Sequence, residues 1–396
     1  MNERQRLRLD MDQKHGLHLG IDATNIRQGG GLTHLSQFLQ AADPVAAGFI
    51  RVTVWTCQST AAVLPERPWL DKRSAPWMDA SLVRRTLGQQ FQLPRELVAA
   101  GCDVLFSPGG TLPAMCRVPA VTMSQNMLPF EPNEAARFGR FSLMRLKMWI
   151  LRYTQGRSFR HADGMIFLTQ YAETAVSTIL GGISFPTALI PHGIERRFLY
   201  PPRPQKPLAV CSRRNPFRVL YVSILMPYKH QAEVALAASK LRVEGLPIEM
   251  RFIGAPSGGY GRQFSALLDQ LDSNREFLHW SGAEPFDALH DFYQNTDVFV
   301  FASSCENLPN ILIEAMAAGL PIASSDRGPM PEVLGEVGVY FDPEVPDTIA
   351  DALRKLAVDA PLRAKLAELA WRKAQVYSWE RCASDTFAFV AQVAQQ

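Results

Sequence analysis

The chain has 396 residues, of which 47% are hydrophobic and 20% are charged, which is the ordinary composition of a globular protein. The formal net charge is only +3, so the composition excludes the bulk positive charge of a nucleic-acid-binding protein. The length exceeds that of one typical hydrophobic core and predicts two domains.

The cysteines and the amino terminus bear on where the protein works. The six cysteines show neither C-x-x-C pairing nor histidines at zinc spacing, which predicts reduced, metal-free thiols in a cytoplasmic protein. No apolar run reaches the roughly 18 residues that a membrane-spanning helix needs. Residues 1–16 are polar and charged without an apolar centre, so we predict a disordered tail there and not a secretory signal.

In the first half of the chain, short runs of aliphatic and aromatic residues predict buried parallel strands. These strands are expected at 17–22, 51–56, 102–107, 119–124, 162–169 and 187–194. A loop at 23–31 ends in three glycines and precedes a predicted helix at 32–40. Such a turn can bring backbone close to a ligand, although G-x-G-x-x-G is absent and a flexible surface turn is the alternative. Residues 59–76 are rich in proline and charge and carry no prediction.

Residues 137–160 form the most basic stretch of the chain and contain neither Asp nor Glu. Its cations are Arg137, Arg140, Arg145, Lys147, Arg152, Arg157 and Arg160, set among aromatic and aliphatic residues. A cationic amphipathic helix of this kind fits an anionic membrane surface. A helix packed on the sheet with a solvated basic face is the equally open alternative.

The second half repeats the alternation of strands and helices after a proline-rich linker. The boundaries that we predict are 17–200 for the first domain, 201–216 for the linker, 217–376 for the second domain and 377–396 for a last helix. Strands are expected at 218–223, 248–254, 277–282, 297–301, 321–325 and 338–343, and helices from 231, at 286–294 and at 349–369. Ser378 is a good N-cap for the last helix. Two doubly wound α/β domains follow from this pattern.

The stretch SSCENLPNILIEAMAAGLP at 303–321 places two carboxylates beside a helix start. Pro309 stands where a first helical residue belongs and Gly319 stands just past the last. Glu306 then lies in the loop after the strand, and Glu314 leans back towards that loop from within the helix. Free amides at a helix start bind anions, and carboxylates accept hydrogen bonds from hydroxyls. The stretch therefore predicts a site for a phosphate joined to polyhydroxyl groups.

This stretch resembles the E-x(7)-E signature of the retaining, GT-B-fold glycosyltransferases of family four, which use nucleotide sugars. The match extends through NLPN at 307–310 and EAMAAGLP at 314–321. The resemblance is firm over residues 215–380 and looser over 17–200. It implies two Rossmann-like domains that face each other across a cleft, with the last helix packed back on the first domain.

The resemblance also implies roles for residues of the donor site. Glu306 contacts the hydroxyls of the donor sugar and steadies positive charge at its ring, and Glu314 binds the ribose. Lys229 holds the diphosphate together with the amides of Leu308, Pro309 and Asn310. Further residues are implied to line the donor site: Ser223, Gly254, Ser281 and Gly282, and Gly30 and Gly31 of the first loop. Gly110, Gln125 and Asn126 are expected on the sugar and acceptor side.

The sequence departs from the pattern of this family at four positions. Ser223 stands where the family has an arginine, and Arg262 or an arginine of the first domain is the candidate replacement. Gln125 and Asn126 stand where many members carry His-Asp; an amide can orient a sugar hydroxyl but cannot act as a base at neutral pH. His192 replaces a frequent asparagine, and a structural hydrogen-bonding role is expected for it.

The predicted function is retaining transfer of a hexose, with mannose favoured, from a donor such as GDP-mannose or a UDP-hexose. The expected acceptor is a glycan or a lipid-linked oligosaccharide in the assembly of a cell-surface polysaccharide such as lipopolysaccharide. No metal, other cofactor or nucleic acid is expected to take part. The protein is expected in the cytoplasm or peripherally on the inner face of the plasma membrane. Two alternatives stay open: a non-catalytic partner that binds nucleotide sugar, and a nucleotide-sugar epimerase of similar fold.

Overall fold

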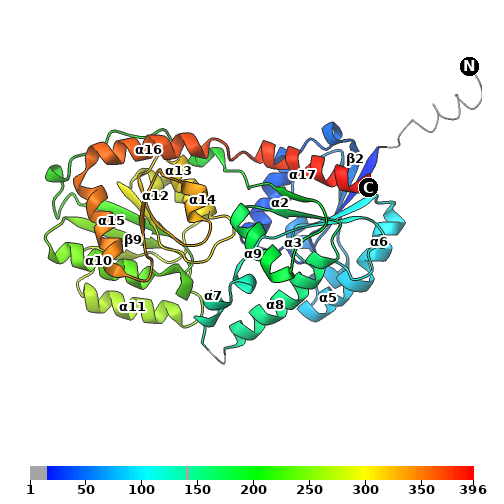
Figure 1. Ribbon diagram of the computed structural model, residues 1–396, viewed down its shortest axis with the longest axis horizontal. Coiled ribbons are helices and arrows are strands. Elements are labelled where there is room, and N and C mark those ends of the chain that lie inside the picture. The colour runs from blue at the N-terminus through cyan, green and yellow to red at the C-terminus, as the bar shows by residue number, and fades with distance from the viewer. Residues whose placement is uncertain (1–15, 140–141) are drawn as a thin grey trace, which may run out of the picture.

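The computed structural model describes residues 16–139 and 142–396, which form two α/β domains joined by a linker (Figure 1). The tail predicted for residues 1–16 lies outside the described residues, apart from Gly16. Each domain is built on one parallel sheet, as the alternation of strands and helices predicts. No helix in the described part of the chain has the length and apolar character needed to cross a membrane.

The sheet of the first domain has seven strands in the order β3-β2-β1-β4-β5-β6-β7. The strands are β1 (Leu17–Asp22), β2 (Phe49–Trp55), β3 (Leu70–Arg73), β4 (Val104–Ser107), β5 (Ala120–Met123), β6 (Gly164–Phe167) and β7 (Thr187–Leu189). Ile21 of β1 pairs with Val54 and Phe106 on either side, and all three are fully buried. Because parallel strands are buried on both faces, they form the continuous apolar runs that predicted all of these strands except β3.

The edge strand β3 was not predicted from the sequence because it has no apolar run. It pairs with β2 alone, and three of its residues, Asp71, Lys72 and Arg73, are charged and only partly buried. Asp71 binds Arg51 at 3.0 Å and Arg73 at 3.1 Å. Charged side chains are typical of edge strands, where they discourage pairing with other chains.

The helices of the first domain cover this sheet and carry its loops. They are α2 (Gly30–Ala41), α3 (Gln58–Ala61), α4 (Pro76–Asp79), α5 (Leu82–Phe91), α6 (Leu93–Ala100), α7 (Pro132–Ala136), α8 (Leu143–Arg160) and α9 (Gln170–Leu180). Short 3₁₀ turns lie at Val45–Ala47, Leu128–Phe130 and Arg196–Phe198. The basic stretch forms α8 from Leu143 onward, because Ser142 caps the helix by accepting a bond from the amide of Arg145 at 3.1 Å.

The second domain has a six-stranded sheet in the order β10-β9-β8-β11-β12-β13. Its strands are β8 (Phe217–Val222), β9 (Ile248–Ile253), β10 (Leu278–Trp280), β11 (Val298–Phe301), β12 (Ile322–Ser325) and β13 (Val339–Phe341). Its helices are α10 (Gln231–Val243), α11 (Tyr260–Leu271), α12 (Leu289–Gln294), α13 (Asn310–Ala317), α14 (Met330–Leu334), α15 (Pro346–Val358) and α16 (Ala360–Ala374), with 3₁₀ turns at Pro227–Lys229 and Phe286–Ala288.

The single helix predicted at 349–369 is wrong, because two helices occupy this region. Asp359 separates α15 from α16 and accepts a hydrogen bond from the amide of Leu362 at 2.8 Å. Pro361 stands in the first turn of α16 and cannot donate a helical hydrogen bond to α15. The chain therefore turns at Asp359.

The proline-rich segment between the domains is held down by Arg363 of α16, whose side chain is fully buried. Its guanidinium donates to the carbonyl of Lys206, to Gln205 at 3.1 Å and to the carbonyl of Ala357 at 2.8 Å. The segment contains a 3₁₀ turn at Leu208–Val210. These bonds fix the connection to the body of the second domain.

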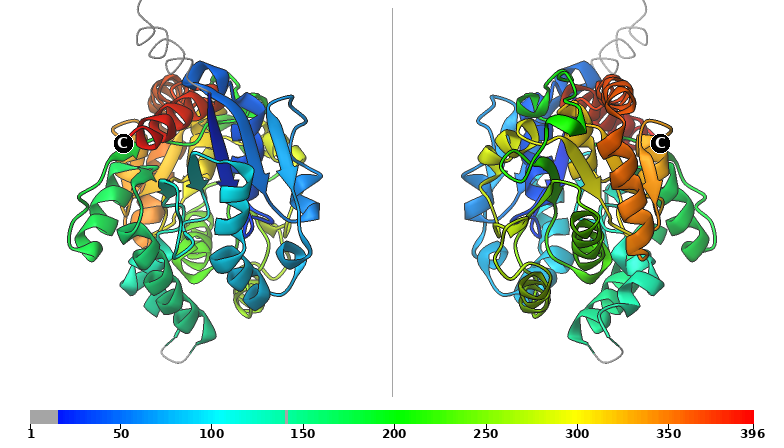
Figure 2. Two further views of the ribbon diagram at one scale, coloured as in Figure 1. Left: turned by 90° about the vertical axis from the view of Figure 1, so that its right-hand side faces the viewer. Right: turned by 90° about the vertical axis from the view of Figure 1, so that its left-hand side faces the viewer.

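The last helix, α17 (Trp379–Ala394), returns to the first domain and appears red in Figures 1 and 2. Ser378 caps it by accepting a bond from the amide of Arg381 at 3.2 Å. Phe387 packs its ring against Phe38 of α2, with centroids 5.1 Å apart. A Cβ on Gly193 would lie 2.1 Å from the backbone nitrogen of Trp379, so glycine lets the turn after β7 touch the start of this helix.

Candidate active site

The stretch at 303–321 folds as a loop and a short helix that follow the buried strand β11. β11 is fully buried. The sequence predicted Pro309 as the first residue of the helix, whereas α13 begins one residue later, at Asn310, and Pro309 is its N-cap. Gly319 adopts a φ of +65° just after the helix, which favours glycine. A Cβ there would also lie 2.7 Å from the nitrogen of Pro202, so the linker passes directly over the helix end.

Lys229 and Glu306 are brought together by the fold. We call the loop at 302–309, between β11 and α13, the motif loop. Lys229 ends the 3₁₀ turn after β8, and its ammonium donates to a carboxylate oxygen of Glu306 in this loop. The two side chains are only 7% and 16% exposed. The ammonium also lies 5.1 Å from the ring centroid of Tyr228 and 5.7 Å from that of Phe301. The sequence predicted both residues in one site but not this direct ion pair.

Glu314 lies in different surroundings, buried in the body of the second domain. Tyr293 donates its hydroxyl to the carboxylate at 2.9 Å. Burial raises the pKa of Glu314 to about 7, against the opposing effect of the Tyr293 hydrogen bond. Because the carboxyl is close to half-protonated at neutral pH, it can both donate and accept hydrogen bonds.

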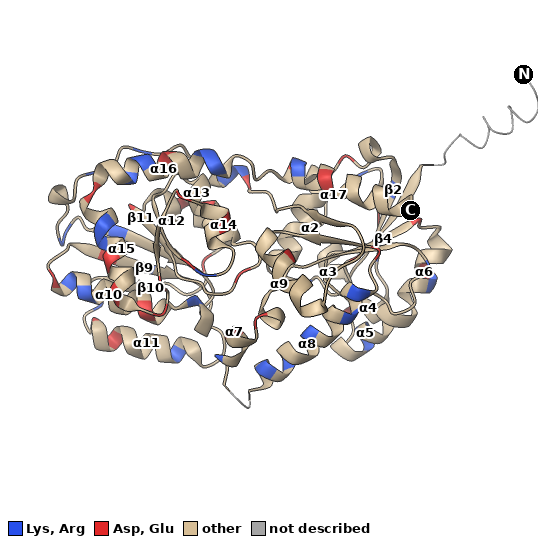
Figure 3. Ribbon diagram, in the orientation of Figure 1, with Lys and Arg blue, Asp and Glu red and all other residues tan. Residues whose placement is uncertain are grey.

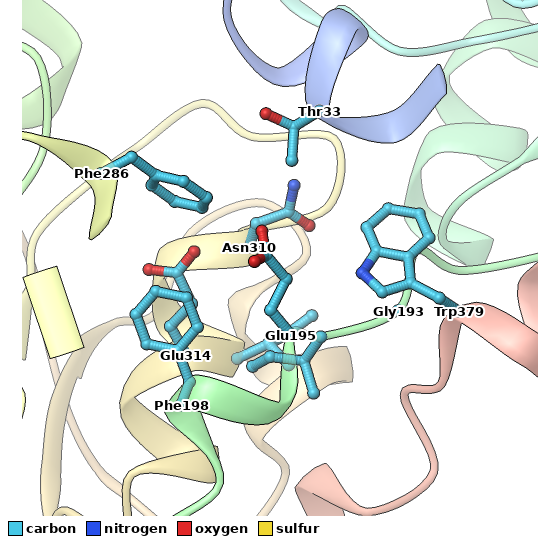
Figure 4. Close-up of a pocket in the computed structure, with 10 residues that line it drawn as sticks. Thr33, Gly193, Glu195, Phe198, Phe286, Asn310, Glu314 and Trp379 are labelled. Atoms are coloured by element: carbon cyan, nitrogen blue, oxygen red, sulfur yellow. The ribbon is translucent and has the colours of Figure 1, made fainter. Parts of the chain in front are cut away.

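A small cavity of about 30 Å³ adjoins Glu314, with room for about one water molecule. Figure 4 shows the carboxyl groups of Glu195 and Glu314 and the amide of Asn310 facing this space, with the ring of Phe286 on one side and that of Trp379 on the other. Thr33 and Trp379 come from elements of the first domain, whereas Glu314, Asn310 and Phe286 belong to the second. The cavity therefore lies at the meeting of both domains.

Asn307 of the motif loop joins the second domain to the first. Its amide donates to the carbonyl and hydroxyl oxygens of Ser124 at 3.0 and 3.2 Å, at the end of β5. Thr169 donates its hydroxyl to the carbonyl of Asn307 at 3.0 Å. The carboxyl end of β5, which leads into the predicted sugar-side residues, is thereby placed against the motif loop.

A chain of polar contacts runs across the same interface from Gln125 to Asn310. The amide nitrogen of Gln125 lies 3.4 Å from Nδ1 of His34, whose ring stacks on that of His192 with centroids 4.5 Å apart. Nδ1 of His192 in turn lies 3.4 Å from the amide nitrogen of Asn310. Burial lowers the pKa of His34 well below its usual value and that of His192 to about 4, so both rings are neutral at pH 7. Neutral rings can accept the amide bonds at Nδ1 but supply no fixed positive charge.

The predicted donor-side residues of β8, β9 and β10 meet at the carboxyl ends of these strands. The amide of Gly254 donates to the carbonyl of Gly282 at 2.7 Å, and a Cβ on Gly254 would lie 1.8 Å from the carbonyl oxygen of Ser223. The neighbouring amide of Ser281 donates to the carbonyl of Phe252 at 3.1 Å. The hydroxyl of Ser223 is buried without a hydrogen-bond partner among the described residues. Arg262, the candidate replacement for the arginine expected at Ser223, lies in the first turn of α11.

The remaining predicted residues of the first domain follow the carboxyl ends of β1, β4 and β5. Gly30 begins α2 with open space around its Cα, and a Cβ on Gly31 would lie 3.6 Å from the side-chain oxygen of Gln125. Asn126 is exposed and accepts a bond from the amide of Leu128 at 3.1 Å, which closes a local turn. Gly110 has a φ of +77° and packs against the side chain of Gln155 from α8. Leu308 is buried in the motif loop.

Sequence reasoning missed two carboxylates that lie near the motif loop. Glu134 of α7 accepts the hydroxyl of Ser304 at 2.6 Å and pairs with Arg137 at 2.7 Å. Glu131 accepts the hydroxyl of Tyr171, and burial raises the pKa of this carboxyl. The proline and glutamate of α7 indicate a helix start, but no local signal shows that this helix meets the second domain.

Comparison with known proteins finds a family model that matches the second domain. Residues 210–372 match the family model described as Glycosyl transferases group 1. The chain is 31% identical over 147 residues to the D-inositol 3-phosphate glycosyltransferase of Corynebacterium urealyticum, covering 36% of this chain and 34% of that protein. It is 27% identical over 169 residues to O-antigen chain mannosyltransferase B of Escherichia coli, covering 42% and 44%. The chain thus spans less than half the length of these curated relatives.

Solved structures resemble the whole chain. A sucrose-phosphate synthase from Thermosynechococcus elongatus has a TM-score of 0.72 at 16% identity, covering 93% of this chain and 97% of that one. WaaG, described as a glycosyltransferase involved in lipopolysaccharide biosynthesis, has a TM-score of 0.68 at 17% identity, covering 94% and 99%. At these identities the likeness concerns the fold, and it confirms the predicted GT-B arrangement of two parallel-sheet α/β domains.

Proposed function

We propose that this protein is a retaining glycosyltransferase that moves a hexose from a nucleotide-sugar donor to a glycan or lipid-linked acceptor. The observation that carries the proposal is the ion pair of Lys229 with Glu306, a residue of the loop that leads into α13, together with Glu314 buried in that helix. The group 1 glycosyltransferase match covers the segment that holds all three residues. A cation, a helix start and two carboxylates suit a diphosphate joined to sugar rings.

In the proposed mechanism, the donor exchanges partners with the ion pair. Its diphosphate binds Lys229 and the first amides of α13, and its sugar hydroxyls bind Glu306, so each side chain gives up the other for the ligand. Glu314 binds the ribose hydroxyls. Positive charge fixed at Lys229 and the helix start then stabilises the negative charge that develops on the leaving diphosphate.

The transfer itself is proposed as a front-face displacement. The bond between the anomeric carbon and the diphosphate oxygen breaks, while a hydroxyl oxygen of the acceptor bonds to the same face of that carbon. The proton of the acceptor hydroxyl passes to the departing diphosphate. No side chain has to act as a base in this scheme, which suits the amide of Gln125 on the sugar side, and we propose that no metal ion is required.

We propose mannose as the favoured sugar and cell-surface polysaccharide assembly as the setting, with GDP-mannose and UDP-hexoses as the donors to test. The relative named O-antigen chain mannosyltransferase B supports this choice. The name of WaaG points to the same kind of pathway, and HepE of Anabaena, at 18% identity and a TM-score of 0.65, is described in complex with UDP and glucose.

The decisive experiment is a donor panel. The protein is incubated with GDP-mannose and common UDP-hexoses, and nucleotide release and the released sugar are measured. Slow hydrolysis of one donor is the expected result. If no donor releases nucleotide while one still binds, the chain is the non-catalytic partner suggested by Ser223 and Gln125. An altered sugar without transfer would indicate the epimerase.

We further propose that α8 docks the protein on an anionic membrane on its cytoplasmic side, at the inner face of the plasma membrane. Apolar side chains of this helix are strongly exposed, with Leu143 at 85%, Trp149 at 66% and Tyr153 at 66%. Arg145 and Lys147 are exposed beside them, and α8 carries basic and no acidic residues (Figure 3). Aromatic and basic side chains together are typical of helices that lie in the membrane interface.

Vesicle flotation tests this docking. Vesicles with anionic lipid should carry the wild type upward, and the double variant Arg145→Gln/Lys147→Gln should float less. Lys365→Gln, an exposed change on α16, is the matched control and should float like the wild type. Equal behaviour with neutral and anionic vesicles would leave α8 with a merely solvated basic face.

A further inference from the structure

A large pocket lies in the first domain between α5 and α8, and we call it the α5–α8 pocket. Its volume is about 590 Å³, within the range of small-molecule sites. Its walls are α5, α8, the segment 109–114 after β4, and Asn25 after β1. None of the roles assigned above to the donor site uses this pocket.

The charged groups on the walls of the pocket favour an anion. Arg85 of α5 and Arg157 of α8 line it, with His161 just past the end of α8, and none of its described lining residues is Asp or Glu. Arg85 donates to the side chain of Asn25 at 2.9 Å. His161 donates from Nδ1 to the carbonyl of Arg157 at 2.8 Å, and its Nε2 takes no part in this bond. Two guanidinium groups on facing walls suit the oxygens of a phosphate.

The inner wall holds an unsatisfied acceptor. Gln155 is only 7% exposed, lines the pocket, and its side-chain oxygen has no partner among the described residues. Gln89 on the opposite wall is held by a bond from its amide to Asp22 at 2.5 Å. A buried acceptor without a partner is unfavourable, so a ligand that offers a hydroxyl to Gln155 would be bound more tightly.

The rim of the pocket is apolar and exposed. Leu82 is 65% exposed, Ile150 47% and Tyr153 66%, and all three line the pocket. Val83 and Trp149 extend the exposed apolar surface along the same two helices. Exposed apolar patches of this kind mark surfaces that bind a partner or a membrane. A ligand that is anionic in the pocket and apolar at the rim is an amphiphile.

The pocket opens from the same sheet edge as the sugar side of the candidate active site. Asn25, Gly109 and Thr111 follow the carboxyl ends of β1 and β4, and Gln125 follows that of β5, the next strand in the sheet. Ligands of parallel α/β sheets bind at this edge. We propose that the α5–α8 pocket binds the phosphate-bearing head of a lipid-linked acceptor, with its apolar chain lying over the rim. This assignment of an acceptor rests on the proposed glycosyl transfer.

Titration calorimetry with decyl phosphate below its micelle concentration tests the pocket. The wild type should bind decyl phosphate more tightly than inorganic phosphate and more tightly than the uncharged decyl maltoside. The double variant Arg85→Gln/Arg157→Gln should bind decyl phosphate about tenfold more weakly or worse, because each arginine supplies charge-assisted hydrogen bonds. Lys365→Gln, which neutralises an exposed cation of α16 outside the pocket, is the control and should bind like the wild type.

A second variant tests whether binding depends on the pocket itself and not only on the positive charge of the protein. Thr154 is exposed and lines the pocket, so Thr154→Trp should obstruct it and weaken binding while circular dichroism shows an unchanged fold. Equal affinities of the arginine variant and the Lys365→Gln control would overturn the proposal. So would binding of inorganic phosphate as tight as that of decyl phosphate, since the site would then take a free phosphate and not a lipid.

The donor panel on the wild type separates this proposal from the proposed function. If the wild type hydrolyses no donor but binds decyl phosphate through the two arginines, the pocket stands and the glycosyl transfer fails. If it hydrolyses a donor but does not bind decyl phosphate, the transfer stands and the lipid acceptor is refuted.

Discussion

We expect the removal of Glu306 to affect the transfer reaction and not the folding of the protein. It lies in a loop, so Glu306→Ala should keep the fold but lower transfer by about a hundredfold or more, the usual effect of losing one electrostatic contact to a transition state. Lys229 then loses its carboxylate partner and is free to pair with phosphate. We therefore expect the variant to bind nucleoside diphosphate at least as tightly as the wild type, as measured by calorimetry.

Glu336→Gln, an exposed change in the same domain, serves as the control and should leave transfer unaltered. An unfolded Glu306→Ala protein would instead assign Glu306 a structural role. Weaker diphosphate binding with normal folding would show that the ion pair itself holds the phosphate site in shape.

Glu314 makes stability depend on pH. Burial raises its pKa to about 7 from an ordinary value of 4.5, so the folded protein holds this proton more tightly than the unfolded chain. The resulting stabilisation is complete below about pH 4.5 and is lost as the pH rises through about 7, because the unfolded chain gives up its proton first. The difference of about 2.5 in pKa corresponds to about 3 kcal/mol.

The substitution Glu314→Gln removes this titration and keeps an oxygen that can accept the hydroxyl of Tyr293. Between about pH 5 and about pH 8, the Tm of the wild type should fall relative to that of the variant. Glu336→Gln should run parallel to the wild type over the same range. Parallel curves for Glu314→Gln as well would mean that Glu314 ionises as an ordinary surface carboxyl.

At the residue scale, site residues that lie in one local sequence pattern can be predicted from the sequence. Site residues that only tertiary contacts bring to the site cannot. Glu306 and Glu314 lie in one strand–loop–helix unit, whose strand, proline and glycine can be recognised without a structure. Glu195 and Trp379 reach the same cavity from the turn after β7 and from the start of α17. Trp379 reaches this cavity because the last helix returns to the first domain and begins where the two domains meet.

At the scale of elements, the contact between Gly193 and α17 makes a sharp prediction. Gly193→Ala puts a methyl group 2.1 Å from the backbone nitrogen of Trp379, so either the turn or the helix must move. We expect a loss of about 1–3 kcal/mol, the usual cost of overpacking, seen as a lower Tm. Gly30→Ala is the matched control, because open space surrounds Gly30 at the start of α2. Equal Tm values for the two variants would show that α17 does not pack as described.

Which elements were predictable follows from how their residues are buried. Central strands such as β1 and β11 are buried on both faces, so their sequences are largely apolar and predict strands. The edge strand β3 has charged side chains and gives no such signal. The break at Asp359 had a signal, since an aspartate followed by a proline at the second position is typical of a helix start, but the apolar period continued through it.

At the scale of the whole molecule, contacts at the start of α9 hold the two domains against each other. The carboxylate of Glu332 accepts bonds from the amides of Gln170 and Tyr171 at 2.8 and 2.9 Å, across the domain interface. Thr169, the N-cap of the same helix, bonds Asn307 of the motif loop. A carboxylate at a helix start is stabilised by the free amides and the helix dipole.

The cavity beside Glu314 holds about 30 Å³, far less than a nucleotide needs, so we expect donor binding at Glu314 to require the domains to part. Glu332→Ala removes two charge-assisted bonds that hold them together and should favour the open arrangement. We expect a larger radius of gyration in small-angle scattering and faster association of nucleotide in stopped-flow measurements. Glu336→Gln, on the same segment, should change neither. If Glu332→Ala enlarges the molecule but leaves the association rate unchanged, the nucleotide reaches Glu314 without opening of the domains. Contact between the domains would then serve the chemical step and not the entry of the nucleotide.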